Sequence, residues 1–312
     1  MAFIDQVDPN APTRAVNHLA QTIETAACWG IAAVLIVYVF RLSRRQGTWL
    51  PLALPLAAAL NSFGEPLFDR GYHLFWYAPG QWTLVSTFGF PQPVWVMSAY
   101  IIVYAIPGLV VMQKVRDGVS RQWIFKAFGV ISLAVATWES LAIYAGTYTY
   151  YGDHPFRAGE YPAWLGVMEG AHITVWAVLV GVLAPVIAKG PRVLLAVPLF
   201  AVAFATVMYG AGLPGLAVTN AHPMPTAGLY LGATASMALA AVMVWLVAQL
   251  LPSERGAARD VPALLRHLAD RLSAGAPAAP AAAPGAAPAP VAPAPAAPAP
   301  ATPAPEPPLA AH

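Results

Sequence analysis

Seven long apolar segments constrain this chain more than any other feature of its sequence. Each is close to the roughly 20 residues that a helix needs to cross the hydrocarbon core of a bilayer, although the second is short. Only 10% of the residues are charged, against about a quarter in soluble domains. The sequence therefore predicts an all-α integral membrane protein, a seven-transmembrane helix bundle with spans at about 21–40, 48–63, 93–112, 123–144, 163–188, 193–209 and 227–251.

The basic residues predict how this bundle is oriented. Nearly all Lys and Arg follow spans one, three, five and seven, whereas the opposite side has only Arg14, Arg70 and Arg157. Because short cytoplasmic loops carry an excess of Lys and Arg, we expect an extracytoplasmic N-terminus and a cytoplasmic C-terminus. The predicted location is the cell membrane, crossed several times.

The chain divides into four predicted regions. An extracytoplasmic segment, 1–20, precedes the seven-helix domain, 21–251. Leucines at helical spacing predict a cytoplasmic amphipathic helix over 252–273. The remainder, 274–312, is almost entirely Ala and Pro, a composition that has nothing to pack and indicates a disordered tail.

Several function classes are excluded by missing motifs. The seventh span has no lysine for a retinal Schiff base, and the chain has no phosphate-binding GKS/T loop, GxSxG elbow or HExxH motif. Its single cysteine, Cys28, excludes an intramolecular disulfide and a multi-cysteine metal site. We expect no cofactor, no metal and no nucleic-acid partner.

Polar residues gather in the predicted outer half of the bundle, most densely over 61–95. Ionisable groups beside an apolar span are costly to remove from water, so such groups face the bundle interior and mark candidate sites. The candidates for catalysis are Glu65, Glu139, Glu169, His172, Asp69 and His73. The candidates for substrate binding are Asn61, Trp76, Tyr77, Trp82, Trp138, Tyr144, Tyr209 and Asn220.

The spacing of two pairs leaves alternatives open. Glu65 and Asp69 share a face if the helix continues, but Pro66 is compatible with a break that would place Asp69 in a loop. Glu169 and His172 lie three residues apart on one helical face, as an acid with its orienting imidazole or as half of a metal site. Only one such ExxH pair is present, which favours the first interpretation.

The same residues have structural interpretations. The carboxylates could pair with neighbouring helices, and the aromatic residues near the outer boundary could form the interfacial belt common to membrane proteins. The functional alternative is an aromatic-lined pocket whose ring faces stabilise a carbocation or hold a flat lipophilic ligand.

The second span resembles that of the small integral-membrane terpene cyclases, seven-span enzymes that close meroterpenoid and indole-terpenoid rings. In TWLPLALPLAAALNSFGEPLFD, Asn61 and Glu65 match the Asn and the essential Glu of that family. The family has Trp before the Glu where this chain has Gly64, and no acid between Glu169 and Glu254 matches its second acid, for which Asn220 or His222 is the nearest substitute. The resemblance implies that Glu65 protonates an epoxide or alkene.

These observations predict a membrane enzyme that acts on a hydrophobic, isoprenoid or lipid-like substrate by acid/base cyclisation or isomerisation. Burial keeps a carboxylic acid neutral at ordinary pH, as an acid-initiated reaction requires. A proton- or cation-coupled transporter or channel subunit is one alternative, although the inner halves of the spans lack polar residues and no inverted repeat is visible. A non-catalytic membrane scaffold is the other. The expected partners are a hydrophobic small molecule and membrane lipid, and the sequence gives no oligomeric state.

Overall fold

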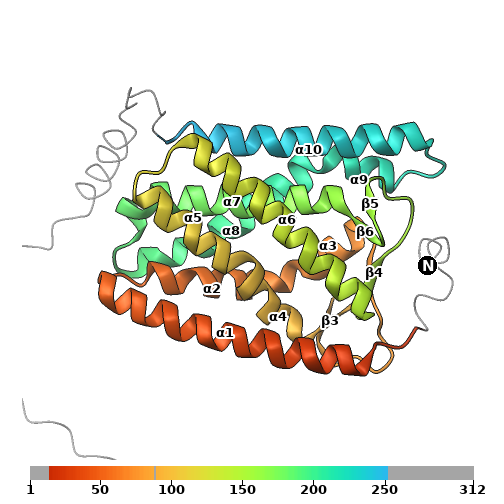
Figure 1. Cartoon of the computed structure of the whole chain (residues 1–312), viewed down its shortest axis with the longest axis horizontal. Helices are drawn as coiled ribbons and strands as arrows, with labels where there is room; N and C mark the ends of the chain where they lie inside the picture. Colours follow the sequence, from red (N-terminus) through yellow and green to blue (C-terminus); the bar gives the residue numbers. More distant parts are fainter. Residues whose placement is uncertain (1–13, 88, 252–312) are drawn as a thin grey trace, which may run out of the picture.

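A computed structural model describes residues 14–87 and 89–251, which form a bundle of helices (Figure 1). Six of the described helical segments are long and apolar enough to cross a membrane. The prediction of a helical, multi-pass membrane protein is therefore confirmed at this level. The six segments are His18–Gln46, Val94–Arg116, Arg121–Ala145, Ala163–Ile187, Gly190–Ala211 and Thr226–Ala248. The predicted amphipathic helix over 252–273 and the predicted tail over 274–312 lie outside the described residues.

Most of the helices are joined by short connections, and the two long connections, 73–93 and 146–162, contain the strands. The α-helices are α1 (His18–Gln46), α2 (Leu50–Asn61), α3 (Glu65–Tyr72), α4 (Val94–Tyr100), α5 (Ile106–Arg116), α6 (Arg121–Ala145), α7 (Ala163–Ile187), α8 (Ala196–Phe204), α9 (Leu213–Thr219) and α10 (Thr226–Ala248). Short 3-10 turns, η3 (Ser62–Gly64) and η5 (Gly190–Leu195), and two π-helical turns, η4 (Ile101–Ala105) and η6 (Ala205–Ala211), join some of them end to end.

The second predicted span is not one continuous helix. Helix α2 has 12 residues, fewer than the roughly 20 needed to cross a bilayer, and it is not among the six long segments. The chain then makes the η3 turn and restarts as α3, with Pro66 in its first turn, where proline is tolerated. Asp69 is therefore helical, and His73 ends α3 in the left-handed conformation at φ 58°. In Figure 1 this segment runs from the left end of the bundle back to the right.

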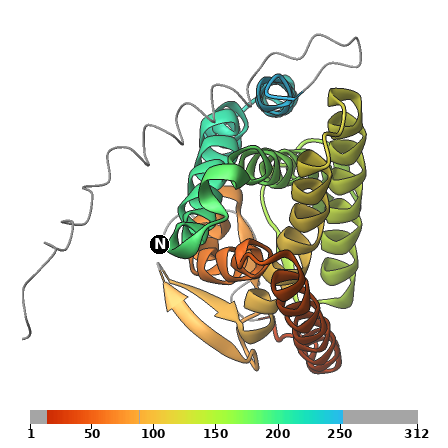
Figure 2. The same cartoon turned by 90° about the vertical axis from the view of Figure 1, so that its left-hand side faces the viewer.

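Three antiparallel strand pairs lie at the end of the bundle where α3 ends and α7 begins (Figure 1). Strand β1 (Leu74–Trp76) pairs with β4 (Tyr148–Tyr150), so that Trp76 lies opposite Tyr148. The other pairs are β2 (Thr83–Thr87) with β3 (Phe90–Pro93), and β5 (Arg157–Ala158) with β6 (Tyr161–Pro162). Figure 2 shows the β2–β3 hairpin standing to one side of the helices. The β1–β4 pair ties together segments that are far apart in sequence.

Helix α7 lies at the centre of the bundle, where most of its side chains are buried. Gly166 and Gly170 face α6, and a Cβ atom built on Gly170 would lie 2.9 Å from the Cα of Ser132. Small residues four apart allow two membrane helices to approach this closely. The contact fixes α6 against α7 at the residue next to Glu169.

Candidate functional site

A small cavity of about 40 Å³ lies between α3, α4, η4, α6, α7 and the β1–β4 strand pair. Its polar lining consists mainly of three glutamates and four tyrosines, and the rest is aromatic or aliphatic. The lining residues are Glu65, Phe68, Leu74, Trp76, Trp95, Val96, Ala99, Tyr100, Val103, Tyr104, Trp138, Glu139, Tyr148, Tyr150 and Glu169.

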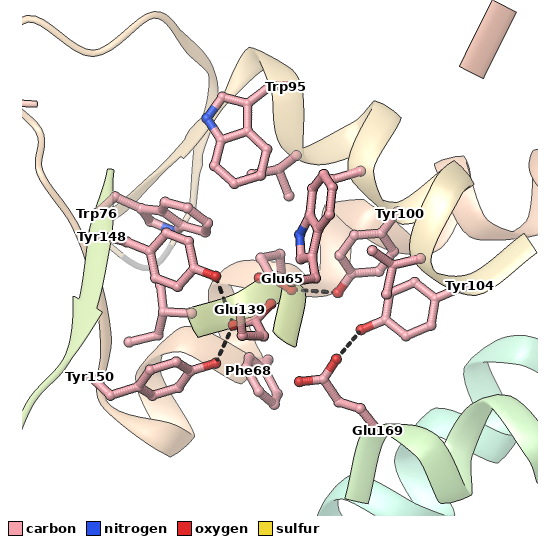
Figure 3. A pocket seen from close by; sticks show the side chains of 15 residues that line it. Glu65, Phe68, Trp76, Trp95, Tyr100, Tyr104, Glu139, Tyr148, Tyr150 and Glu169 are labelled. Carbon is pink, nitrogen blue, oxygen red and sulfur yellow. Dashed lines mark hydrogen bonds between the residues drawn. The ribbon is translucent and has the colours of Figure 1, made fainter. Parts of the chain in front are cut away.

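Each of the three glutamates accepts a hydrogen bond from a tyrosine hydroxyl (Figure 3). Tyr100 donates to Oε2 of Glu65, and Tyr104 donates to Oε2 of Glu169 at 3.1 Å. Glu139 has two donors on the same Oε2 atom, the Tyr148 hydroxyl at 2.8 Å and the Tyr150 hydroxyl at 3.2 Å. The three acids are thus held by tyrosines from α4, η4 and β4.

The helical stretch from α4 into η4 and the strand β4 place these tyrosines. Tyr100 ends α4 and Tyr104 lies in the π-helical turn η4, and their ring centroids are 4.6 Å apart. Because a π turn is wider than an α turn, it changes the direction of the side chains that follow it, and such turns recur at functional sites. Tyr148 and Tyr150 are alternate residues of β4, so both side chains point to the same face of the strand, toward Glu139.

The cavity walls are mostly aromatic rings in mutual contact. The Trp76 ring lies edge-on to Trp95 at 5.6 Å between centroids and tilted against Tyr148 at 4.7 Å. Tyr148 also contacts Trp95 and Tyr150, at 6.3 Å in both cases. Edge-to-face aromatic packing of this kind favours fixed ring positions, so several ring faces border one space.

No Lys, Arg or His belongs to the lining residues of this cavity. Glu65 and Glu169 are only 8% and 4% exposed. Ionising three carboxyl groups close together in an apolar space without a cation would be costly, because each charge is desolvated and repels the others. At least one of the three is therefore expected to hold its proton at neutral pH.

Asp69 lies behind Glu65 and does not line the cavity. It is completely buried and accepts a 2.8 Å hydrogen bond on Oδ2 from the indole nitrogen of Trp76. The two acids are four residues apart on one helix, and the other carboxyl oxygen of Asp69, Oδ1, is buried without a hydrogen-bond partner. Two buried carboxylates this close would repel each other, so at least one of the pair is expected to hold a proton.

A second polar cluster lies nearer the end of the bundle. The Nε2 atom of His73 is 3.1 Å from Oδ1 of Asn220, and the His73 ring lies edge-on to that of His154 at 5.9 Å. Burial, with smaller contributions from the charges of His73 and Arg157, lowers the pKa of His154 to about 3. Burial also lowers the pKa of His73, opposed by its hydrogen bond with Asn220. This cluster therefore holds neutral imidazoles.

His172 lies in the core next to the cavity. Its ring packs against Tyr104, Phe200 and Phe204, at centroid distances of 5.3, 4.6 and 5.1 Å. The imidazole does not line the cavity, and within the described residues no hydrogen bond joins it to Glu169, whose partner is Tyr104. The acid–imidazole pair predicted from the ExxH spacing is thus replaced by an acid–phenol pair.

The remaining predicted binding residues have varied positions. Trp76 and Trp138 line the cavity. Asn61 donates to the carbonyl oxygens of Ala57 and Val197, which ties α2 to α8. The others lie away from the cavity: Tyr77 under the Arg14 guanidinium at 4.4 Å, Trp82 47% exposed, Tyr144 93% exposed, Tyr209 against Tyr72 and Phe204, and Asn220 on His73.

Tyr100 and Tyr104 were not among the residues predicted from the sequence. Both lie inside an otherwise apolar span, four residues apart, and this spacing was the available signal. A hydroxyl group at this depth needs a partner, because water is not there to provide one. Two such tyrosines on one turn predict an acceptor on a neighbouring helix, and the structure provides two.

Within the described part of the chain, no group of three or more His, Cys, Asp and Glu side chains is placed to hold a metal ion. Comparison of the sequence and structure with protein-family models, curated proteins and solved structures finds no match. Any function proposed for the chain therefore depends on the cavity itself.

Proposed function

We propose that this protein is a membrane enzyme that acts on a hydrophobic, isoprenoid or lipid-like substrate by acid/base chemistry, as a cyclase or isomerase. The observation that carries the proposal is the cavity in which three tyrosine-bound carboxyl groups face aromatic walls without a basic residue. The match of Asn61 and Glu65 to the terpene cyclases supports the same reaction class.

The hydrogen bonds suggest different roles for Glu139 and Glu169. Two hydroxyl donors on one oxygen of Glu139 favour its carboxylate form, which suits a base that removes a proton. Glu169 is 4% exposed and has one donor at 3.1 Å, so its neutral form is favoured and suits an acid. In general, when the environments of two carboxyl groups favour different protonation states, the neutral group can be assigned as the acid and the charged group as the base.

Glu65 is the second candidate acid. Repulsion between Glu65 and the buried Asp69 favours a proton on one of the two, and Tyr100 donates to the Oε2 atom of Glu65. Asp69 with Trp76 would act as a positioning pair behind Glu65, because Asp69 does not line the cavity. Proton donation to an alkene or epoxide by Glu65 or Glu169 would create a positive centre in the substrate.

The aromatic walls suit such a centre. The faces of Trp and Tyr rings attract cations, by about 2 kcal/mol or more when desolvated. The same walls keep water from a reactive cation, and Glu139 is available to remove the proton that ends the reaction. The glutamates would thus donate the proton that starts the reaction and remove the proton that ends it, while the aromatic rings stabilise the cation formed in between.

We further propose that the chain crosses the cell membrane seven times, with an extracytoplasmic N-terminus and a cytoplasmic C-terminus. The broken segment 50–72 would be the additional crossing. Broken helices are tolerated at membrane depth when protein surrounds them, and most of α2 is buried. The acid cavity would then lie in the outer half of the bundle.

The test is a profile of lipids and small molecules from cells that express the wild type or single variants at matched protein levels. The variants are Glu65→Gln, Glu139→Gln and Glu169→Gln, and the control is Glu160→Gln, an exposed acid outside the cavity. We expect a hydrophobic product with the wild type and the control, reduced at least about 100-fold in one or more cavity variants, since a positioned acid or base contributes about 100- to 10,000-fold.

Two results would contradict the proposal. Profiles that are identical for the wild type and all folded variants would argue against catalysis on any lipid in the cell. Loss of the product in the control as well would show that the change does not depend on the cavity acids. Gel filtration of each variant separates these results from misfolding.

A further inference from the structure

A second, entirely apolar hollow lies on another side of α2. It has a volume of about 390 Å³, within the range of ligand sites. Helices α1 and α2, the turn η4 and the turn η5 supply its lining, which includes Ile36, Ala53, Leu56, Ala59 and Leu194. All ten lining residues are apolar, so the lining of the groove, unlike that of the acid cavity, contains no acidic side chain.

Short side chains on α2 create this groove. Ala53, Pro55 and Ala59 leave space beside the side chains of α1, and the ring of Trp49 lies at the start of α2, 5.8 Å from that of Phe40. Trp49 and Leu56 are 44% and 41% exposed, so the groove is open at the bundle surface. In a membrane crossed by the candidate spans, a surface groove at their depth would be in contact with lipid chains.

Basic residues neighbour the groove's lining residues in the sequence at the Trp49 end. Arg44 and Arg45 lie in the last turn of α1, just before Trp49. Thr48 donates a 2.6 Å hydrogen bond to the carbonyl oxygen of Ala188, which brings this end next to Lys189 and Arg192. Arg192 directly precedes the lining residues Val193 and Leu194. These four cations are exposed, and the one ion pair among residues 14–87 and 89–251, Arg157–Glu160, does not involve them.

We infer that this groove binds a phospholipid with an anionic headgroup. One acyl chain lies against the apolar lining, and the phosphate and headgroup lie among Arg44, Arg45, Lys189 and Arg192. Basic pockets between membrane helices bind acidic lipid headgroups in this way, because the positive side chains attract the negative charge of the headgroup. The inference is independent of the proposed enzymatic function, since it uses none of the cavity acids.

The test uses the full chain, purified in detergent, with native mass spectrometry after addition of either phosphatidylglycerol or phosphatidylcholine of the same chain length. We expect the wild type to retain phosphatidylglycerol at least about 5-fold better than phosphatidylcholine. The double variant Lys189→Gln/Arg192→Gln removes headgroup contacts, and Ala59→Trp fills the groove, so each should lose this preference. Lys126→Gln is the control, because it removes an exposed basic residue from α6, which does not line the groove.

Three results would overturn the inference. The first is equal retention of the two lipids by the wild type, a measurement that does not depend on any variant folding. The second is full retention of phosphatidylglycerol by a monodisperse Ala59→Trp variant, which would mean that the headgroup binds without the groove. The third is an equal loss in Lys126→Gln, which would indicate a general effect of positive charge.

Discussion

The acid cavity and the apolar groove are neighbours in the bundle, and α4 with its continuation η4 borders both. Tyr100 lines the first and Ile101, the next residue, lines the second. The cavity is bordered by the β1–β4 strand pair and buried aromatic rings, whereas the groove is open and has no polar side chain in its lining. This contrast indicates that the fold places the three cavity acids where other parts of the chain shield them from lipid and provide hydroxyl donors.

Removing both hydrogen-bond donors to Glu139 is the most direct test of the role of the acid cavity. In a Tyr148→Phe/Tyr150→Phe variant, the carboxylate would lose two hydrogen bonds, each worth about 1.5 kcal/mol or more to a charged group. We expect product formation to fall about 100-fold, measured in the cell profile. Tyr144→Phe, which changes an exposed tyrosine of α6, should leave it unchanged; an unchanged double variant would remove Glu139 from the mechanism.

The glycine contact between α6 and α7 tests whether close packing holds the cavity together. Gly170→Ala would place a methyl group against the backbone of Ser132, and we expect a loss of about 2 to 3 kcal/mol of stability. Gly129→Ala is the matched control, because a Cβ atom there would lie more than 4 Å from any neighbouring segment of the chain. Thermal unfolding in detergent is the measurement, and equal transitions for the two variants would disprove the close contact.

The hydroxyl group of Tyr72 is important for the second π turn. The Gly212 amide donates to the Val207 carbonyl at 2.9 Å, so the Met208 carbonyl loses its helical donor and accepts from Tyr72 instead. Tyr72→Phe would leave that buried carbonyl unsatisfied, at a cost of about 2 kcal/mol. Thermal unfolding should show this loss in Tyr72→Phe but not in Tyr38→Phe, an exposed tyrosine on α1.

The imidazole cluster predicts a loss of stability in acid. The pKa of His154 is about 3 in the folded protein, against an ordinary value of 6.5, so the unfolded chain binds more protons between these values. Stability should therefore fall as the pH drops below about 6.5, by roughly 1 kcal/mol from this residue at about pH 5.5. His154→Gln should make unfolding less dependent on pH than His18→Gln does, and equal profiles would contradict the burial of a neutral imidazole.

The smallest effect is expected at the exposed ion pair. Arg157 and Glu160 are 3.6 Å apart, and the Glu160 side chain is 72% exposed. Exposed pairs contribute little because water screens them, so Glu160→Gln should change stability by less than about 0.5 kcal/mol. A larger change in thermal unfolding would mean that the loop between β4 and α7 contributes more to closing the cavity than its exposure indicates.

Part of the candidate site could be predicted from single residues. Glu65, Glu139 and Glu169 each interrupt or border an apolar segment, which sets them apart within the sequence, and all three line the cavity. Their partners were harder to identify, because Tyr148 and Tyr150 resemble interfacial aromatics and reach Glu139 only through the β1–β4 pairing. Short strands of three residues have no periodicity long enough to predict them.

Composition and the order of residues were enough to predict a helical, multi-pass membrane protein whose polar residues gather toward one end of its helices. Both predictions follow from local sequence, because the cost of burying a charge or an unpaired backbone group in lipid applies wherever the chain lies. Packing in three dimensions settled which acids share a cavity, which tyrosines donate to them and which predicted residues, such as Tyr144, face outward. Those outcomes depend on helix rotation and on close contacts such as Gly170 against Ser132, which no single segment encodes.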